Sequence, residues 1–297
     1  MTPVEATIGT VRAAVGSFHP AAMPRLARAH YRREVIAWLL ISTMMGAVTG
    51  GVVGVIAKNA FAGQVPEHWL NISVALVTGA QAFAHLTSFL WASLSHGRHK
   101  VRFLVGLQIA AAALVAMIAL APISWVGLLL FTSGAVLIQV CWSGVVTLRT
   151  TVWRANYSRG TRARTTGKIA TFQAIMMSAS AIAVGFLMRW DPSAFHLLYP
   201  LAAAFGLIGA AVYGRMRVRG HRLLLANERR DLEEGGAGAV SPLQIWRILR
   251  DDKLFRRYMI AMFIFGIGNL SATSLMVIVV RDAFGYEYLR GIAVTAS

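Results

Sequence analysis

The sequence predicts an all-α integral membrane protein with seven transmembrane helices. Of its 297 residues, 57% are hydrophobic and only 14% are charged, whereas soluble domains are nearer half apolar and a quarter charged. The hydrophobic residues also occur in long blocks that lack Lys, Arg, Asp and Glu except near their ends. This composition excludes a disordered chain, and a single cysteine, Cys141, excludes a disulfide scaffold.

Seven of these blocks reach the roughly 20 apolar residues that a membrane-spanning helix needs. The first block is too long for a cleaved signal peptide and has no small-residue cleavage site after it. A soluble helical protein is the alternative, but its core would have to cover seven charge-free helices. We expect the spans at Val35–Ala57, Trp69–Ala92, Val101–Ala121, Ser124–Leu148, Ile169–Trp190, Ser193–Tyr213 and Tyr258–Val280.

Basic residues are distributed unequally between the two sides of the predicted membrane. The N-terminal segment 1–34 and the loops after spans two, four and six carry 25 of the 29 Lys and Arg residues, and the other side carries four. The positive-inside rule places the N-terminus in the cytoplasm, in a bacterial-type plasma (inner) membrane. Topology and contact with anionic lipid then explain the net charge of +17, so nucleic acid is not an expected partner.

An internal repeat surrounds the first and seventh spans. Residues 32–37 (RREVIA) match 256–261 (RRYMIA), and residues 58–61 (KNAF) match 281–284 (RDAF), at offsets of 224 and 223. Both copies run in the same direction, which predicts a parallel six-helix repeat. A complete second copy would end near position 437, so we expect this chain to be truncated. The predicted parts are a cytoplasmic segment 1–34, a six-helix half 35–213, a cytoplasmic linker 214–257 and the beginning of a second half, 258–297.

The linker between the two halves has three predicted pieces. Arg215–Glu234 alternates in charge and is typical of an extension of the sixth helix, and Gly235–Gly238 interrupts it. Ser241 and Pro242 then form a helix start. The amphipathic helix predicted at 242–255 carries an apolar stripe that favours a position on the membrane surface. A solvated connector is the alternative.

These features make the chain resemble the major facilitator superfamily of transporters. The loop after the second span resembles the family's basic signature through Gly97, Arg98, Lys100 and Arg102, a predicted cytoplasmic gate. The signature's aspartate is missing, which puts in doubt the latch that it supplies in relatives. The fifth span also lacks the proline of the antiporter signature, which argues against a drug/proton antiporter.

Polar residues inside the spans are the candidates for a substrate cavity, because each costs free energy in lipid unless it faces protein or water. Thr78, Gln81, His85 and Ser88 share one helical face of the second span. Under the repeat, Thr49 corresponds to Thr273, and Asn269 lies near mid-membrane. Interhelical hydrogen bonding is the alternative for every one of them. The candidates are Thr49, Thr78, Gln81, His85, Gln139, Trp142, Asn269 and Thr273.

The sequence therefore favours a secondary transporter that moves a small, unidentified solute by alternating access. The resemblance implies this class, and topology and the repeat support it. We expect no enzymatic activity, catalytic residue, cofactor or metal site, and a monomer in the lipid bilayer. We also expect no acidic residue embedded in the seven spans, so that any proton-coupling acid would lie in the missing half. A seven-helix membrane scaffold, sensor or enzyme without transport remains the alternative.

Overall fold

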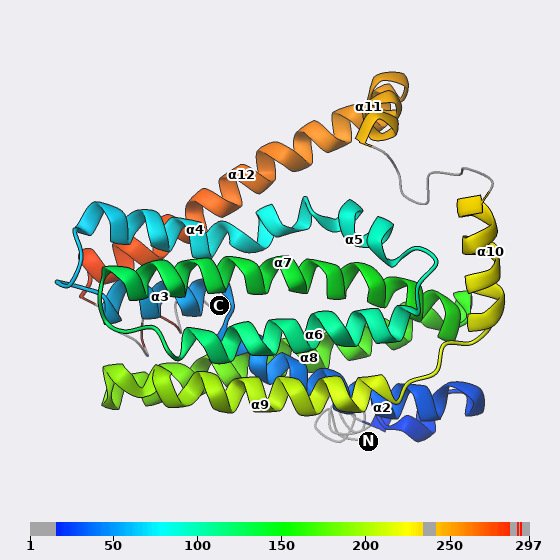
Figure 1. The fold of residues 1–297 in the computed structure, drawn as a ribbon, viewed down its shortest axis with the longest axis horizontal. Helices are drawn as coiled ribbons and strands as arrows, with labels where there is room; N and C mark the ends of the chain where they lie inside the picture. Colours follow the sequence, from blue (N-terminus) through cyan, green and yellow to red (C-terminus); the bar gives the residue numbers. More distant parts are fainter. Residues whose placement is uncertain (1–15, 234–241, 286–289, 291, 293–297) are drawn as a thin grey trace, which may run out of the picture.

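The computed structural model describes residues 16–233, 242–285, 290 and 292 as helices joined by short turns (Figure 1). No strand occurs among these residues. Five of the described helices are long and apolar enough to cross a membrane, or six if one bent pair forms a single span. The predicted all-helical class is confirmed, and the apolar helices indicate a membrane protein.

The first predicted span is broken rather than continuous. Helix α2 (Arg25–Ala47) ends at Val48, and α3 (Gly50–Ala60) begins after Thr49, whose backbone is extended. The break interrupts the helical hydrogen bonds, and the Val48 carbonyl instead accepts a bond from Gln139 Nε2 at 3.0 Å. A buried amide from a neighbouring helix thus stabilises the break, since an unpaired carbonyl would be costly there.

The second predicted span is bent. Helix α4 (Glu67–His85) and α5 (Ser88–Ser95) meet at 47°. The Thr87 side chain lies at the bend, where its hydroxyl donates to the Ala84 carbonyl at 2.7 Å and accepts from Trp91 Nε1 at 3.1 Å. The polar face predicted for one straight helix is therefore divided, with Ser88 on the far side of the bend.

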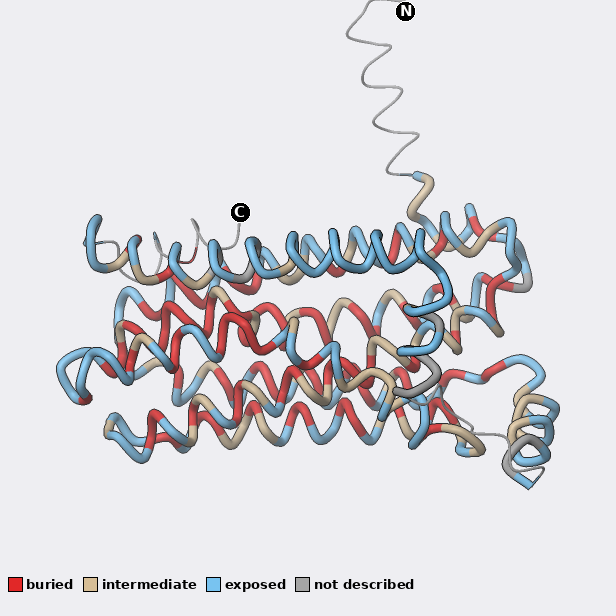
Figure 2. Tube along the Cα trace, turned by 90° about the horizontal axis from the view of Figure 1, so that it is seen from above, coloured by how far each residue is buried: buried red, intermediate tan, exposed pale blue. Residues whose placement is uncertain are grey.

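The next four long helices complete a bundle around α2 and α3 (Figures 1 and 2). Helix α2 packs against α8 and α9, α6 against α7 and α9, and α4 against α7 and α3. Buried residues line the interior of this bundle, as Figure 2 shows. The bounds are α6 Lys100–Ile118, α7 Trp125–Asn156, α8 Arg159–Trp190 and α9 Phe195–Gly214, with single 3-10 turns at Pro20–Ala22 (η1) and Pro192–Ala194 (η2).

Glycines allow α2 to approach its neighbours closely. A Cβ on Gly46 would lie 2.5 Å from the Met177 carbonyl oxygen of α8, and one on Gly209 of α9 would lie 3.0 Å from the Ala37 carbonyl oxygen. The small-residue stripe of the first span continues into α3, where Gly50 faces the backbone of Thr78 at a similar separation. These glycines serve packing between membrane helices.

The linker departs from the predicted extension of the sixth helix. Helix α9 ends at Gly214, and a turn with Gly220 in the left-handed region (φ +64°) precedes a separate helix, α10 (His221–Glu233). Only glycine adopts this conformation without strain, so Gly220 redirects the chain. The amphipathic segment forms α11 (Pro242–Asp251), which ends before the predicted position 255 because Asp252 starts a new helix as its N-cap.

Helix α12 (Lys253–Asp282) contains the predicted seventh span and joins the bundle at one end only. Its C-terminal half packs against α3 and α4, and its N-terminal half leads away from the bundle towards α11 (Figure 1). Every residue of 253–265 is exposed, including Phe263 and Phe265. From Tyr258 to Phe265 these exposed residues lack charge and are apolar on every side of the helix, which is typical of a membrane or a protein interior.

Candidate functional site

The end of the bundle at which α12 meets α3 and α4 carries an ion cluster around a buried lysine. Lys58 of α3 is only 4% exposed at its side chain. Its Nζ lies 3.3 Å from Glu67 Oε1, 2.6 Å from Asn71 Oδ1 and 3.1 Å from Asp282 Oδ2 of α12. A pocket of about 570 Å³ adjoins this cluster. We call this end of the molecule the closed end, since Lys58 connects three helices there.

A second polar contact joins α12 to α4 deeper in the bundle. The hydroxyls of Thr78 and Ser274 lie 2.7 Å apart. Beside them, Val277 of α12 is buried, and its methyl groups lie close to Gly54 of α3. Between Ser274 and Asp282, therefore, α12 is held by one hydroxyl pair, one ion pair and a small apolar contact.

The opposite end of the molecule, where α5 and the beginning of α12 lie, is the open end. Two of the predicted cavity residues, Gln81 and His85, continue the Thr78 face of α4 towards this end, and both are exposed. The structure thus places Thr78 in contact with α12 and leaves Gln81 and His85 uncovered, one and two turns further along. This exposed polar face of α4 is the candidate solute path.

Other predicted cavity residues lie inside the six-helix bundle. Gln139 is buried and bonded to the break in the first span, and Trp142 is buried edge-to-face against Trp38, with ring centroids 5.7 Å apart. Thr49 is half-buried, and its hydroxyl donates to the Gly46 carbonyl at 3.3 Å. The side chains of Asn269 and Thr273 lie outside the described residues.

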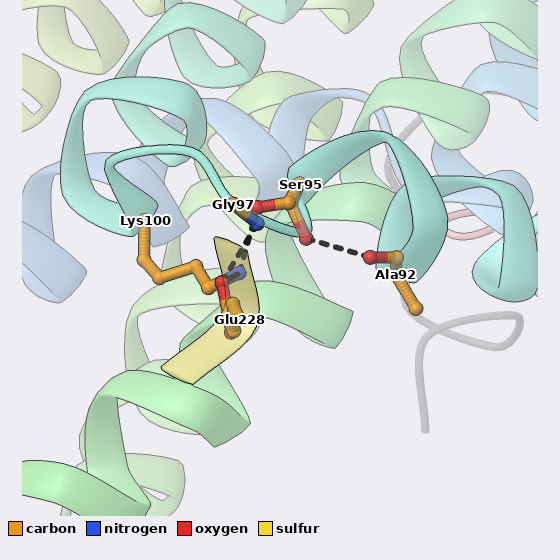
Figure 3. A network of polar contacts seen from close by, with 5 residues as sticks. All are labelled: Ala92, Ser95, Gly97, Lys100 and Glu228. Atoms are coloured by element: carbon orange, nitrogen blue, oxygen red, sulfur yellow. Dashed lines mark hydrogen bonds and ion pairs between the residues drawn. The ribbon is translucent and has the colours of Figure 1, made fainter. Parts of the chain in front are cut away.

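The basic signature loop between α5 and α6 receives a carboxylate from the linker (Figure 3). Glu228 Oε2 of α10 accepts from the Gly97 backbone N–H and from Lys100 Nζ, both at 2.8 Å. Lys100 is 4% exposed and also donates to the Ser95 carbonyl at 2.6 Å. Gly97 adopts φ +68°, which favours glycine and leaves its N–H directed at Glu228. A residue distant in sequence therefore supplies a carboxylate to this loop.

The remaining signature residues lie around this contact. Arg98 lies over the Phe103 ring at 5.9 Å, and the Arg102 backbone N–H donates to His99 Nδ1 at 3.4 Å, so that His99 caps α6. The His99 ring also contacts His221 of α10, with centroids 4.0 Å apart. Two imidazoles and one carboxylate thus dock α10 on the start of α6.

We expect this docking to weaken in acid. Burial, followed by His221 and Arg102, lowers the pKa of His99 below its usual value. A group with a lowered pKa in the docked state stabilises docking above about pH 6.5 and loses that contribution as the pH falls. Protonation of His99 Nδ1 also removes the cap and adds a positive charge beside Arg102 and His221.

The measurement is the distance between spin labels at Leu223 of α10 and Ile109 of α6, in a Cys141→Ser background. Both positions are exposed. The distribution of distances between the labels should broaden as the pH is lowered from 7.5 to 5.5. His99→Asn keeps a good N-cap but does not titrate, so its distribution should stay constant. Identical broadening in both proteins would show that His99 is not responsible.

Glu34 of α2, one residue before the predicted first span, is a fully buried acid. It was expected at the membrane boundary but is 0% exposed, inside a candidate span of residues 27–60. Trp38 Nε1–H, at 3.4 Å, and Trp153 Nε1–H donate to its Oε1, and the Tyr157 hydroxyl donates to its Oε2 at 2.5 Å. Three neutral donors from two helices thus surround the carboxylate.

A cation accompanies this acid without pairing directly with it. Arg149 of α7 has its guanidinium carbon 4.7 Å from the ring centroids of both Trp38 and Trp153. Its Nη1 donates to Gln173 Oε1 of α8 at 2.9 Å. Glu34 and Arg149 therefore share the same two indoles, and together they connect α2, α7 and α8. Polar groups of this kind within membrane helices are expensive and mark functional sites.

Comparison with protein-family models finds no match, and comparison with curated proteins finds no significantly similar relative. Among the described residues, no three His, Cys, Asp or Glu side chains are arranged to hold a metal ion. The function must therefore be inferred from the geometry of the two ends of the bundle and from the buried acid.

Proposed function

We propose that the protein is a secondary transporter of the major facilitator type, which carries a small solute by alternating access. The observation that carries this proposal is the attachment of α12 at one end only. Among the described side chains, an ion pair holds α12 to α3 at the closed end and a hydroxyl pair holds it to α4 deeper in the bundle, whereas the first turns of α12 lie free of the bundle. Such a geometry is expected where two halves rock about a central site.

The charge distribution supports an assignment of sides. The open end carries the beginning of α2, the loop between α5 and α6, and α10, which belong to the side with 25 of the 29 Lys and Arg residues. With that side in the cytoplasm, the arrangement is open to the cell interior and closed to the outside. The seven-helix topology, the parallel repeat and the inner membrane are parts of the same proposal.

The solute path in this proposal runs along α4 between the two ends. Thr78, Gln81 and His85 line it from the first half. The sequence predicts Asn269 and Thr273 as the contributions of α12, and their side chains lie outside the described residues. These groups are neutral or weakly basic, which favours a neutral or amphipathic solute. Thr78 has a double role, because its contact with Ser274 must break when the closed end opens.

Glu34 gives the proposed transporter a group that can carry a proton. Its carboxylate is the only buried acidic side chain among the described residues of the candidate spans. A change in the packing of α2 against α7 would alter the three donors and Arg149 around it, and so would favour or disfavour protonation. We propose that proton uptake at Glu34 is coupled to rocking of α12 against the bundle.

Proteoliposomes with a trapped pH-sensitive dye test the proposal. Solutes from a fixed panel of sugars, neutral amino acids, monocarboxylates and amphipathic cations are added outside, and proton flux and solute uptake are recorded. We expect at least one solute to move protons, and Glu34→Gln to abolish that movement. No uptake of any solute by a folded protein would favour the scaffold, sensor or enzyme alternative. Solute uptake without proton flux would contradict the proposed proton coupling at Glu34 but not the proposed transport.

A further inference from the structure

An apolar groove of about 650 Å³ lies where the N-terminal segment crosses α2 and α8. Its walls come from residues 18–20, from the second and third turns of α2, and from α8 beyond its charged start. The only charged side chain that lines it is Arg32. The apolar wall residues are Phe18, Pro20, Tyr31, Val35, Phe172 and Ile175, with Ile36 at the edge.

Specific contacts hold the groove open. The Tyr31 hydroxyl donates to the Phe18 carbonyl at 3.1 Å, and the Phe18 ring packs edge-to-face on Phe172 with centroids 5.3 Å apart. Lys168 of α8 donates to the Ser17 carbonyl, and its Nζ lies 5.7 Å from the Phe18 ring centroid. Ser17 and Phe18 are thus attached to both helices, and these contacts fix one wall of the groove.

The surroundings of the groove indicate what fills it. Ile36 and Ile175 are 43% and 58% exposed within candidate membrane spans, so the groove opens on the apolar outer surface of the bundle. Each helix changes there from a charged first part to an apolar run. The groove therefore straddles the depth at which lipid headgroups meet acyl chains, whichever side of the membrane this end occupies.

The charge at this depth is strongly positive. Segments 25–33 and 159–168 carry eight Lys and Arg residues, and the only acid in 16–36 and 159–178 is Glu34, which is buried and bonded. The guanidinium groups of Arg28 and Arg162 donate hydrogen bonds to backbone carbonyls. Arg32 is exposed, and no hydrogen bond or ion pair engages its guanidinium in the described part of the chain. An anionic group above the groove would meet this free guanidinium.

We propose that the groove binds an acyl chain of an anionic phospholipid, with the headgroup phosphate on Arg32. A guanidinium matches phosphate geometry, and the apolar walls of the groove match an acyl chain. The inference depends on the membrane placement of α2 and α8 but not on transport. Its failure would leave the proposed function untouched, and its success would not establish that function.

The test is native mass spectrometry of the detergent-purified protein after exchange with phosphatidylglycerol or phosphatidylethanolamine. Ile175→Trp fills the groove, and Ile182→Trp is its control, because Ile182 is 53% exposed on the same helix two turns away. Arg32→Gln removes the proposed phosphate ligand, and Arg164→Gln removes an exposed cation that does not line the groove. All four positions are exposed, so the variants should fold, and gel filtration checks this.

We expect the wild type and both controls to retain phosphatidylglycerol preferentially, and Ile175→Trp and Arg32→Gln to retain it several-fold less. Equal retention by all five folded proteins would overturn the site. If the protein retained phosphatidylethanolamine as well as phosphatidylglycerol, the proposed selectivity for an anionic headgroup would be wrong.

Discussion

Replacing Glu34 with leucine is expected to destabilise the protein by about 3–5 kcal/mol, the range found when one partner of a buried charged network is removed. The change leaves two indole N–H groups and the Tyr157 hydroxyl without their acceptor, and it leaves Arg149 without a nearby negative charge. Glu34→Gln keeps one acceptor oxygen and should cost less. The unfolding temperatures of the wild type and the two variants, measured in detergent by tryptophan fluorescence, test this ranking.

Glu67→Gln is the control for this prediction. Glu67 forms an ion pair with Lys58, but the Glu67 side chain is 72% exposed, and exposed ion pairs are worth about 0–1 kcal/mol. Its unfolding temperature should therefore stay close to that of the wild type. If Glu34→Leu unfolds no earlier than Glu67→Gln, the carboxylate does not hold α2, α7 and α8 together.

Cross-linking α12 to α4 is expected to stop transport. In a Cys141→Ser background, cysteines at positions 78 and 274 replace two hydroxyls that lie 2.7 Å apart, so they should form a disulfide on mild oxidation. The bond fixes the closed end, and alternating access requires that end to open. Solute uptake or coupled proton flux should fall at least tenfold on oxidation and return on reduction.

The single-cysteine proteins, Thr78→Cys and Ser274→Cys, are the controls, because oxidation should leave their transport unchanged. A cross-linked protein that still transports would mean that the contact between α4 and α12 is permanent. The two halves would then not move as proposed.

The helical class and the approximate positions of the first six spans could be predicted, because long apolar runs determine both. The breaks within the first two spans could not. The signal at the first break is weak: Val48 and Thr49 precede Gly50, and the compensating amide, Gln139, is far away in sequence. At the second, Thr87 is one of several polar residues in the stretch, between His85 and Ser88. Tertiary partners decide whether such a residue interrupts a helix.

The buried acid was missed because Glu34 follows two arginines, which placed it at the membrane surface. A signal was nevertheless available. Arg149, Trp153 and Tyr157 recur at intervals of four on α7, so they form one polar-aromatic face that needs a partner. Glu34, with Trp38 one turn later, is that partner. No local pattern could have assigned it, because the pairing spans more than a hundred residues.

The same limitation applies to the signature loop. Its basic residues could be recognised from sequence, but the carboxylate that engages them, Glu228, lies in a linker helix that alternates in charge. One acid among several gives no sign of docking until α10 turns back at Gly220. Sequence alone also could not show which polar residues line the predicted cavity. Thr78 and Gln139 are both polar, but Thr78 contacts α12 and Gln139 bonds to the break in the first span.

The central claim, that α12 rocks against the six-helix bundle, is tested most directly by the distance between their free ends. Spin labels at Leu94 of α5 and Met259 of α12, both exposed, report this distance at the open end in proteoliposomes without any knowledge of the solute. We predict a shorter and a longer distance between the labels while the cysteines at 78 and 274 are reduced. Once these cysteines are oxidised, we predict only the longer distance. A single distribution, the same before and after oxidation, would contradict alternating access.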